Sequence, residues 1–136
     1  MNLVDTSGWI EFLFGGDNAA VFAPVIEDTA GLLVPVICLY EVFKKVNAVA
    51  DEAKALQAVA QMKQGCVVDI TEDIALRAAL ISLKRRLPMA DSLIISTAWT
   101  RQATLWTQDK HFLGLPGVEY RQARTKASSV RGKPRR

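Results

Sequence analysis

Four acidic residues stand at places in the chain from which they could share one site. Asp5 ends the short apolar run that opens the chain, and Asp109 follows the apolar segment 105–107 by two residues. Glu41 lies about two turns into a segment with helical periodicity, and Asp91 lies in the first turn of another. Ligands of an open α/β sheet bind beyond the carboxyl ends of its strands, and adjacent parallel strands are only ~4.8 Å apart. We therefore expect the four acids to converge on one pocket.

Converging carboxylates repel one another, and a desolvated charge without a partner is costly. A divalent cation removes this conflict, and Mg²⁺ in particular is held through one or two carboxylates, several waters and the phosphate oxygens of a substrate. The pattern thus predicts metal-assisted hydrolysis of a phosphodiester bond. The chain has a single histidine, His111, which argues against a zinc site built from several histidines. Because no histidine or lysine is obvious as a general base, we assign activation of the water to the metal and the carboxylates.

Each acid also has an ordinary structural interpretation. Asp5 and Asp109 could cap the helical segments that follow them. Glu41 could pair with Lys45 one turn later, and Asp91 suits the first turn of a helix because of the helix dipole. Taken singly, each acid leaves both interpretations open, and their combination favours a shared site.

Strands alternate with helices along the chain. Short apolar runs predict a strand that ends at Asp5, further strands at 32–34, 66–70 and 105–107, and a fifth, edge strand at 118–120. Periods of three to four residues predict helices over 7–14, from 18 to about 28, from 35 onwards, and over 51–63, 71–86 and 89–102. Helix caps are predicted at Asp17, Asp51 and Asp73. This alternation predicts a three-layer α/β/α fold with a parallel sheet of four to five strands.

The net charge of +3 conceals two regions of opposite sign. Residues 121–136 carry seven basic residues and no acid, so residues 1–120 have a net charge of −4. The basic segment lacks a periodic apolar face, and we expect it to be a mobile tail.

The chain opens without a signal-peptide pattern and has no apolar run near the ~20 residues of a spanning helix. Cys38 and Cys66 lie in apolar runs and are interpreted as core residues in a reducing compartment. We expect a soluble, cytoplasmic protein with no membrane partner.

Four motifs together resemble PIN-domain ribonucleases, specifically the VapC-type toxins of toxin–antitoxin systems. They are Leu3-Val4-Asp5-Thr6-Ser7, the helix that carries Glu41, the segment 87–94 (LPMADSLI) and the segment 105–112 (LWTQDKHF). They occur in order within residues 1–120, which we take as one PIN-like nuclease domain. The basic tail is a departure from the family pattern.

The resemblance implies a parallel sheet in the order 3-2-1-4-5, Mg²⁺ or Mn²⁺ as cofactor, cleavage of RNA, a homodimer and a cognate antitoxin protein. It assigns catalytic and metal-binding roles to Asp5, Glu41, Asp91 and Asp109, with Ser7 and Thr107 as supporting hydroxyls. Candidates for contacts with RNA phosphates are the basic residues Lys84, Arg85, Arg86, Arg121 and Arg124.

Other functions fit parts of the same pattern. A PIN-like nuclease of RNA processing would share the acids without being a toxin, and a non-catalytic RNA-binding module would account for the basic tail. The second alternative gives no reason to gather four acids where phosphate must bind. A phosphate-receiver domain needs adjacent acids at the first strand, and a haloacid-dehalogenase-type phosphatase needs an aspartate at the position of Ser7; both are disfavoured.

Overall fold

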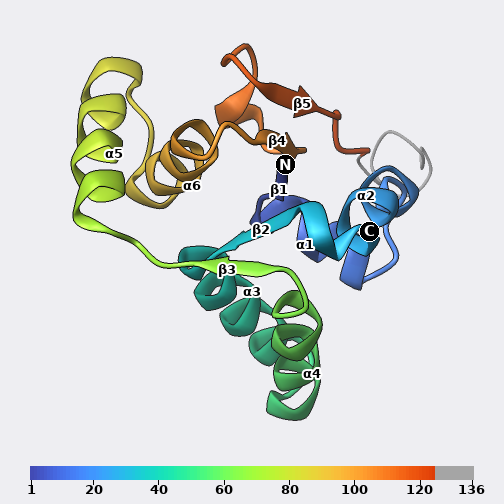
Figure 1. The fold of residues 1–136 in the computed structure, drawn as a ribbon. Coiled ribbons are helices and arrows are strands. Elements are labelled where there is room, and N and C mark those ends of the chain that lie inside the picture. The colour runs from blue at the N-terminus through green and yellow to red at the C-terminus, as the bar shows by residue number, and fades with distance from the viewer. Residues whose placement is uncertain (125–136) are drawn as a thin grey trace.

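The computed structural model describes residues 1–124 and contains a five-stranded, fully parallel sheet in the order β3-β2-β1-β4-β5 (Figure 1). The strands are β1 (Asn2–Val4), β2 (Leu32–Pro35), β3 (Cys66–Val68), β4 (Thr104–Thr107) and β5 (Val118–Tyr120). The predicted strands, including the edge strand at 118–120, and the predicted strand order are confirmed.

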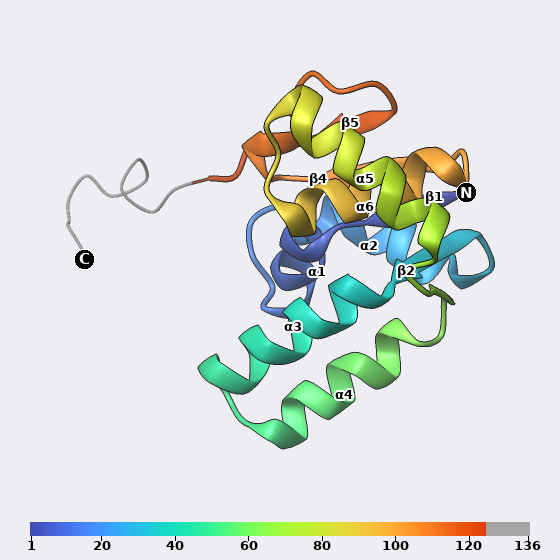
Figure 2. The ribbon, with the colours of Figure 1, turned by 90° about the vertical axis from the view of Figure 1, so that its left-hand side faces the viewer.

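Helices flank the sheet on both sides. They are α1 (Thr6–Leu13), α2 (Ala19–Glu27), α3 (Val36–Val49), α4 (Glu52–Met62), α5 (Glu72–Arg85) and α6 (Met89–Thr100), with short 3₁₀ turns η1 (Thr29–Gly31) and η2 (Lys110–Phe112). Helices α1 and α2 lie on one side and α5 and α6 on the other, while α3 and α4 form a projecting pair (Figures 1 and 2). None of the helices within residues 1–124 has the length and apolar character needed to cross a membrane.

The centre of the sheet supplies the core. Leu3 and Val4 of β1, Leu33 of β2 and Leu105 of β4 are fully buried. Helix α6 packs between α5 and the sheet, and the run 94–98 along it is buried. The first turn of α6 is thereby fixed against the core, which matters because Asp91 lies in it.

Two of the predicted helix caps are wrong. Asp51 caps α4, since its Oδ1 accepts from the backbone N–H of Lys54 at 2.8 Å. Helix α5 is instead capped by Thr71, and Asp73 forms an exposed ion pair with Arg77. The N-cap of α2 is Asn18, without a side-chain cap, so Asp17 does not take that role. A run of neighbouring polar residues marks a helix start without showing which of them turns its oxygen inward.

The two cysteines differ. Cys38 is buried in α3, as expected, but Cys66 is exposed at the beginning of the edge strand β3. The expectation that both belong to the core is wrong for Cys66, because only Val68 of this short strand is buried.

Gly8 in the first turn of α1 permits close packing over β1. A Cβ atom at this position would lie 2.6 Å from Val4 Cγ1 and 2.9 Å from Phe22 Cε1, which is closer than such contacts allow. The absence of a side chain therefore lets α1 sit close enough to β1 for the loop between them to hold Asp5.

We expect Gly8→Ala to lower the free energy of unfolding by about 1–3 kcal/mol, because both neighbours are buried side chains that must move. Urea unfolding followed by circular dichroism measures this. The control is Gly31→Ala, whose new methyl meets only the exposed Asp28 side chain at 3.1 Å and should change stability by less than about 0.5 kcal/mol. Equal effects of the two substitutions would contradict the packing argument.

Candidate active site at the carboxyl edge of the sheet

Asp5 lies directly beyond β1, beside the end of β4. Val4 pairs with Trp106, so the next residues of the two strands, Asp5 and Thr107, are neighbours. The Thr107 hydroxyl donates to Asp5 Oδ2 at 2.7 Å, while Oδ1 accepts from the Ser7 hydroxyl at 2.7 Å and from the Gly8 N–H at 3.0 Å. Asp5 is thus the N-cap of α1 and also a wall of the cleft described below. The two interpretations of this residue are compatible.

Asp5 is 2% exposed, and burial raises the pKa of its carboxyl from 3.8 to about 6. The hydrogen bonds from Thr107, Gly8 and Ser7 oppose this rise in the pKa, and the nearby charge of Asp109 adds to it. Three neutral donors therefore orient the carboxylate without fully compensating its desolvation. The remaining cost of burying the negative charge favours a bound cation.

Asp109 follows β4 and is tied to Asp5 through one hydroxyl. Its backbone N–H donates to Thr107 Oγ1 at 2.9 Å, and Thr107 in turn donates to Asp5. The Asp109 side chain caps η2 by accepting from the backbone N–H of His111 at 2.9 Å. Here too a capping acid faces the cleft.

Asp91 projects from the first turn of α6 and is half-buried. Burial raises the pKa of its carboxyl, the hydrogen bond with His111 lowers it, and the charge of Asp109 raises it.

Glu41 reaches the same region from α3, where its Oε1 accepts a hydrogen bond from the Thr6 hydroxyl. Within residues 1–124, Glu41 makes no ion pair with Lys45, so the simple surface pair considered for it does not form.

All four acids line one cleft of about 400 Å³. Its other lining residues are Thr6, Ser7, Ile10, Lys45, Ile94 and Gln108. The structure therefore brings together Asp5, Glu41, Asp91 and Asp109 from four separate elements, with Ser7 and Thr107 bonded to Asp5.

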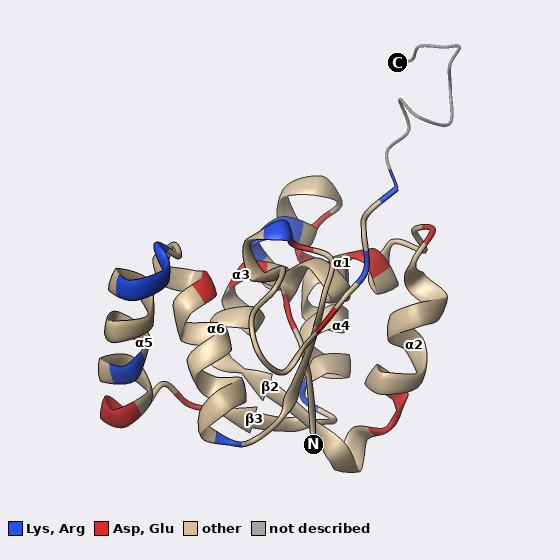
Figure 3. Ribbon diagram, turned by 90° about the horizontal axis from the view of Figure 1, so that it is seen from above, with Lys and Arg blue, Asp and Glu red and all other residues tan. Residues whose placement is uncertain are grey.

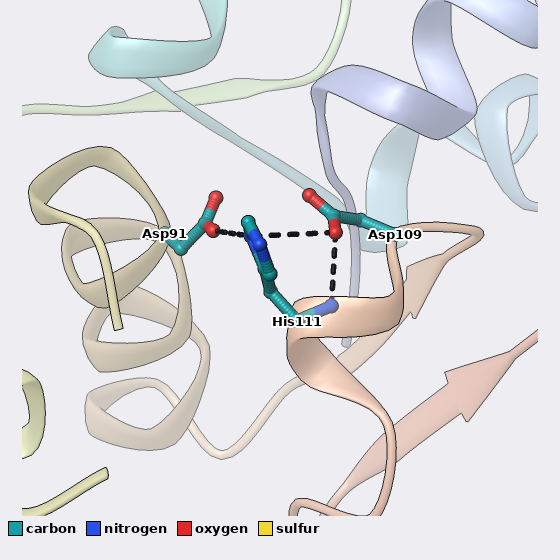
Figure 4. Close-up of side chains that lie close together, drawn as sticks. All are labelled: Asp91, Asp109 and His111. Atoms are coloured by element: carbon teal, nitrogen blue, oxygen red, sulfur yellow. Dashed lines mark hydrogen bonds and ion pairs between the residues drawn. The ribbon is translucent and has the colours of Figure 1, made fainter. Parts of the chain in front are cut away.

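His111 is a member of the cluster that the sequence interpretation did not include. Its Nδ1 lies 2.6 Å from Asp91 Oδ2 and 3.5 Å from Asp109 Oδ1 (Figure 4). The pKa of His111 is raised, first through its hydrogen bond with Asp91 and then through the charge of Asp109. The feature of the sequence that could have pointed to His111 is its position two residues after Asp109.

The chemistry of these groups fits a hard divalent cation. One ligand atom from each of Asp91, Asp109 and His111 lies within 4.8 Å of the others. Carboxylate oxygens suit Mg²⁺ and Mn²⁺, and the imidazole nitrogen suits transition metals. Asp5 and Glu41 supply further carboxylates in the same cleft.

The basic candidates lie outside the cleft. Of its described lining residues, only Lys45 is a cation. The 84–86 cluster ends α5 at the margin of the molecule (Figure 3), where the Arg85 guanidinium lies 5.8 Å from the centre of the Trp99 ring. Arg121 and Arg124 are exposed, and the backbone N–H of Arg121 donates to the Thr107 carbonyl. The other basic residues of the tail fall outside the described part of the chain.

Comparison with known proteins identifies the family and agrees with the fold. The family model for the PIN domain matches residues 3–117, whereas a search of curated proteins finds no match. A toxin–antitoxin complex from Klebsiella pneumoniae is similar in structure, with TM-score 0.72 and 26% identity over 88% of this chain and 96% of that one.

Two further solved structures share the fold. Mycobacterium tuberculosis VapC20, described as a sarcin–ricin loop cleaving toxin, has TM-score 0.74 and 16% identity, covering 88% of this chain and 98% of its own. VapBC2 from Rickettsia felis, bound to a DNA fragment from the promoter, has TM-score 0.70 and 14% identity, with 90% and 98% covered.

The raised pKa of Asp5 predicts how the stability of metal-free protein depends on pH. The folded protein keeps the proton of the Asp5 carboxyl at pH values where the unfolded chain has lost it. The stabilisation by protonated Asp5 is therefore complete below pH 3.8 and is lost as pH rises through about 6. Asp5→Asn cannot lose a proton. Between pH 4 and 7 the free energy of unfolding of the parent should therefore fall by on the order of 3 kcal/mol relative to that of Asp5→Asn.

Urea unfolding in EDTA over this pH range measures the difference. Asp17→Asn, at an exposed acid outside the cleft, should leave the pH dependence of the parent unchanged. A constant stability difference between parent and Asp5→Asn would show that Asp5 titrates normally.

Proposed function

The chain belongs to the PIN domain family, and on that premise we propose that it is a metal-dependent endoribonuclease that acts as the toxin of a toxin–antitoxin pair. The observation that carries the proposal is the cleft lined by Asp5, Glu41, Asp91 and Asp109. The similar VapC20 toxin, described as cleaving the sarcin–ricin loop, supports RNA as the class of substrate. The similar toxin–antitoxin complexes support a cognate antitoxin protein as partner.

The cofactor of the proposal is Mg²⁺ or Mn²⁺, held by Asp91 and Asp109 with Asp5, Glu41 and His111 as the further groups of the site. When bound, such a cation supplies Lewis-acid chemistry that activates water and offsets negative charge on a phosphodiester. The partners are an RNA, the antitoxin and a second copy of this chain, and the location is the cytoplasm.

The side chains of the cleft have distinct roles in this proposal. Ser7 and Thr107 hold the Asp5 carboxylate in one orientation, and Thr107 also fixes the backbone of Asp109. The ammonium group of Lys45 gives the cleft wall a positive charge that can attract a phosphate. Asp5, with its pKa of about 6, is mostly ionised at neutral pH and available to a cation.

Two alternatives make different predictions. A non-catalytic RNA-binding module would bind RNA without cutting it, and EDTA would not change this binding. A PIN-like nuclease of RNA processing would cut RNA but would have no antitoxin. A reading frame for a small DNA-binding protein immediately upstream of the gene favours the toxin.

We expect Asp91→Asn to reduce Mg²⁺-dependent cleavage of labelled RNA by more than roughly 100-fold, because a proposed ligand of the cation loses its charge. The raised pKa of Asp91 shows that burial of its charge, together with repulsion from Asp109, outweighs the hydrogen bond with His111. Removal of this charge should therefore leave the metal-free protein melting at the parent temperature or slightly above it. Cleavage assays beside thermal melts with and without Mg²⁺ give both quantities.

The matched control is Asp73→Asn, at an exposed acid whose ion pair with Arg77 lies outside the cleft. It should cut RNA at close to the parent rate and keep the stabilisation by Mg²⁺. An Asp91→Asn protein that melts earlier without metal and cuts RNA at the parent rate would refute the site.

The basic tail gives a separate prediction about RNA binding. Removal of residues 125–136 deletes the five basic residues Lys126, Arg131, Lys133, Arg135 and Arg136. We expect weaker RNA binding and a shallower salt dependence, by about 0.7 units of log–log slope for each phosphate that the tail binds in the full chain. Affinities measured at several salt concentrations test this with the Asp91→Asn protein, which does not consume the RNA. An unchanged slope would mean that the tail does not bind nucleic acid.

A further inference from the structure

A closed ring of hydrogen bonds lies at the rim of the acidic cleft, which Gln108 helps to line. Gln108 Nε2 donates to Glu11 Oε1 at 3.1 Å, and the backbone N–H of Asn18 donates to Glu11 Oε2 at 2.7 Å. Asn18 Nδ2 closes the ring by donating to Gln108 Oε1 at 3.0 Å, and it also donates to the Gln122 carbonyl at 3.1 Å. An amide nitrogen carries two hydrogens, so both bonds form together. We call Glu11, Asn18, Gln108 and Gln122 the rim network.

The local sequence favours this network over a capped start of α2. Asn18 stands at the N-cap position, where asparagine ordinarily accepts a hydrogen bond from the helix. Here it makes no side-chain cap, and its amide is directed to Gln108 and Gln122 instead. Gly16 makes room for the network, because a Cβ atom at this position would lie 2.4 Å from the carboxyl atoms of Glu11.

The rim network determines where the basic segment begins. After β5, the backbone N–H of Arg121 donates to the Thr107 carbonyl at 2.9 Å, and Asn18 then holds the Gln122 carbonyl. The chain thus passes the end of β4 and runs towards α2 (Figure 1). Arg121 is exposed there, and the residues that follow it carry six further basic side chains and no acid.

The acidic cleft gives this position a consequence. Four carboxyl groups line the cleft, and Lys45 is the only cation among its described lining residues. A bound divalent cation and Lys45 together offset three negative charges, so charge alone does not draw a phosphate backbone into the cleft. Lysine and arginine side chains are the groups that bind nucleic-acid phosphates, and the segment held at the rim is rich in them.

We propose that Asn18 is a positioning residue that holds the beginning of the basic segment at the rim of the cleft, so that the basic side chains after it bind the phosphates of an RNA strand entering the cleft. The inference rests on the proposed nuclease function and adds a positioning residue to it. A tethered group acts at a local concentration that falls as its tether lengthens. Loss of the bond to the Gln122 carbonyl frees the first residues of the segment and lengthens the tether.

The first test measures RNA affinity in the Asp91→Asn background, which does not consume the RNA. We expect Asn18→Leu to weaken binding by roughly three- to tenfold and to make its salt dependence shallower. The comparison is a full-length protein in which the six basic residues after Gln122 are replaced by glutamine. There, Asn18→Leu should change the affinity by less than about twofold, because the charges through which it acts are gone. Asn47→Leu, at an exposed asparagine of α3, is the matched control and should bind RNA like the parent.

Equal effects of Asn18→Leu in the two backgrounds would overturn the proposal, because Asn18 would then act on the cleft itself. An affinity that Asn18→Leu leaves unchanged would overturn it as well. Cleavage by protein with Asp91 intact makes the same distinction: the KM for RNA should rise while kcat stays within about twofold of the parent value. A fall in kcat at unchanged KM would assign Asn18 to the geometry of the cleft.

A second variant disturbs the rim network without changing Asn18. The methyl group of Gly16→Ala displaces the Glu11 carboxylate from its bonds to Asn18 and Gln108, so RNA binding should weaken as it does in Asn18→Leu. Gly31→Ala is the control, and circular dichroism of both proteins reports whether the fold is kept. A folded Gly16→Ala protein that binds RNA as well as Gly31→Ala would contradict the role of the network.

Spin-label distances test the anchor without RNA. A Cys66→Ser background removes the exposed cysteine and leaves the buried Cys38. Labels at Ala60→Cys and Ala123→Cys, both exposed positions, should give a narrow distance distribution in protein diluted with unlabelled chains. Asn18→Leu should broaden it, and equal widths would overturn the anchor. This result is separate from the proposed function, which fails if the parent with Mg²⁺ does not cut RNA.

Discussion

The burial of one carboxylate at the end of the first strand is the constraint around which the site is built. Asp5 is almost fully enclosed, and no cation bonds to it within the described residues. A buried carboxylate needs partners, and here they are two hydroxyls and one backbone N–H. Each partner belongs to an element whose position depends on β1: Ser7 and Gly8 begin α1, and Thr107 ends the adjacent strand β4. The sheet register and the site geometry are therefore determined together.

The sequence predicts this arrangement well where strand ends and helix starts determine it. Asp5 and Asp109 could be placed near each other because parallel strands end at one edge, and Glu41 and Asp91 because their helices begin there. From the sequence, capping and chemistry are alternative roles for an acid. The structure shows Asp5 and Asp109 accepting from backbone N–H groups while they face the cleft.

Other features could not be predicted because they depend on side-chain direction. The spacing Asp109-x-His111 does not reveal that the imidazole turns back over its own capping acid to reach Asp91, since this depends on where α6 packs. The same holds for the cap of α5. Thr71, Glu72 and Asp73 together predict a helix start, but only the structure shows that Thr71 and not Asp73 turns its oxygen toward the backbone N–H groups. Exposure of Cys66 follows from its place at the margin of the sheet, which strand composition does not fix.

Helix α6 connects the acidic cleft to helix α5. It carries Asp91 in its first turn, is buried along 94–98, and is bonded through Ser96 to the backbone of α5. Packing of α5 on α6 thus fixes the helix from whose first turn Asp91 enters the cleft. The position of this acid depends on the helix pair as well as on the sheet edge that holds Asp5 and Asp109.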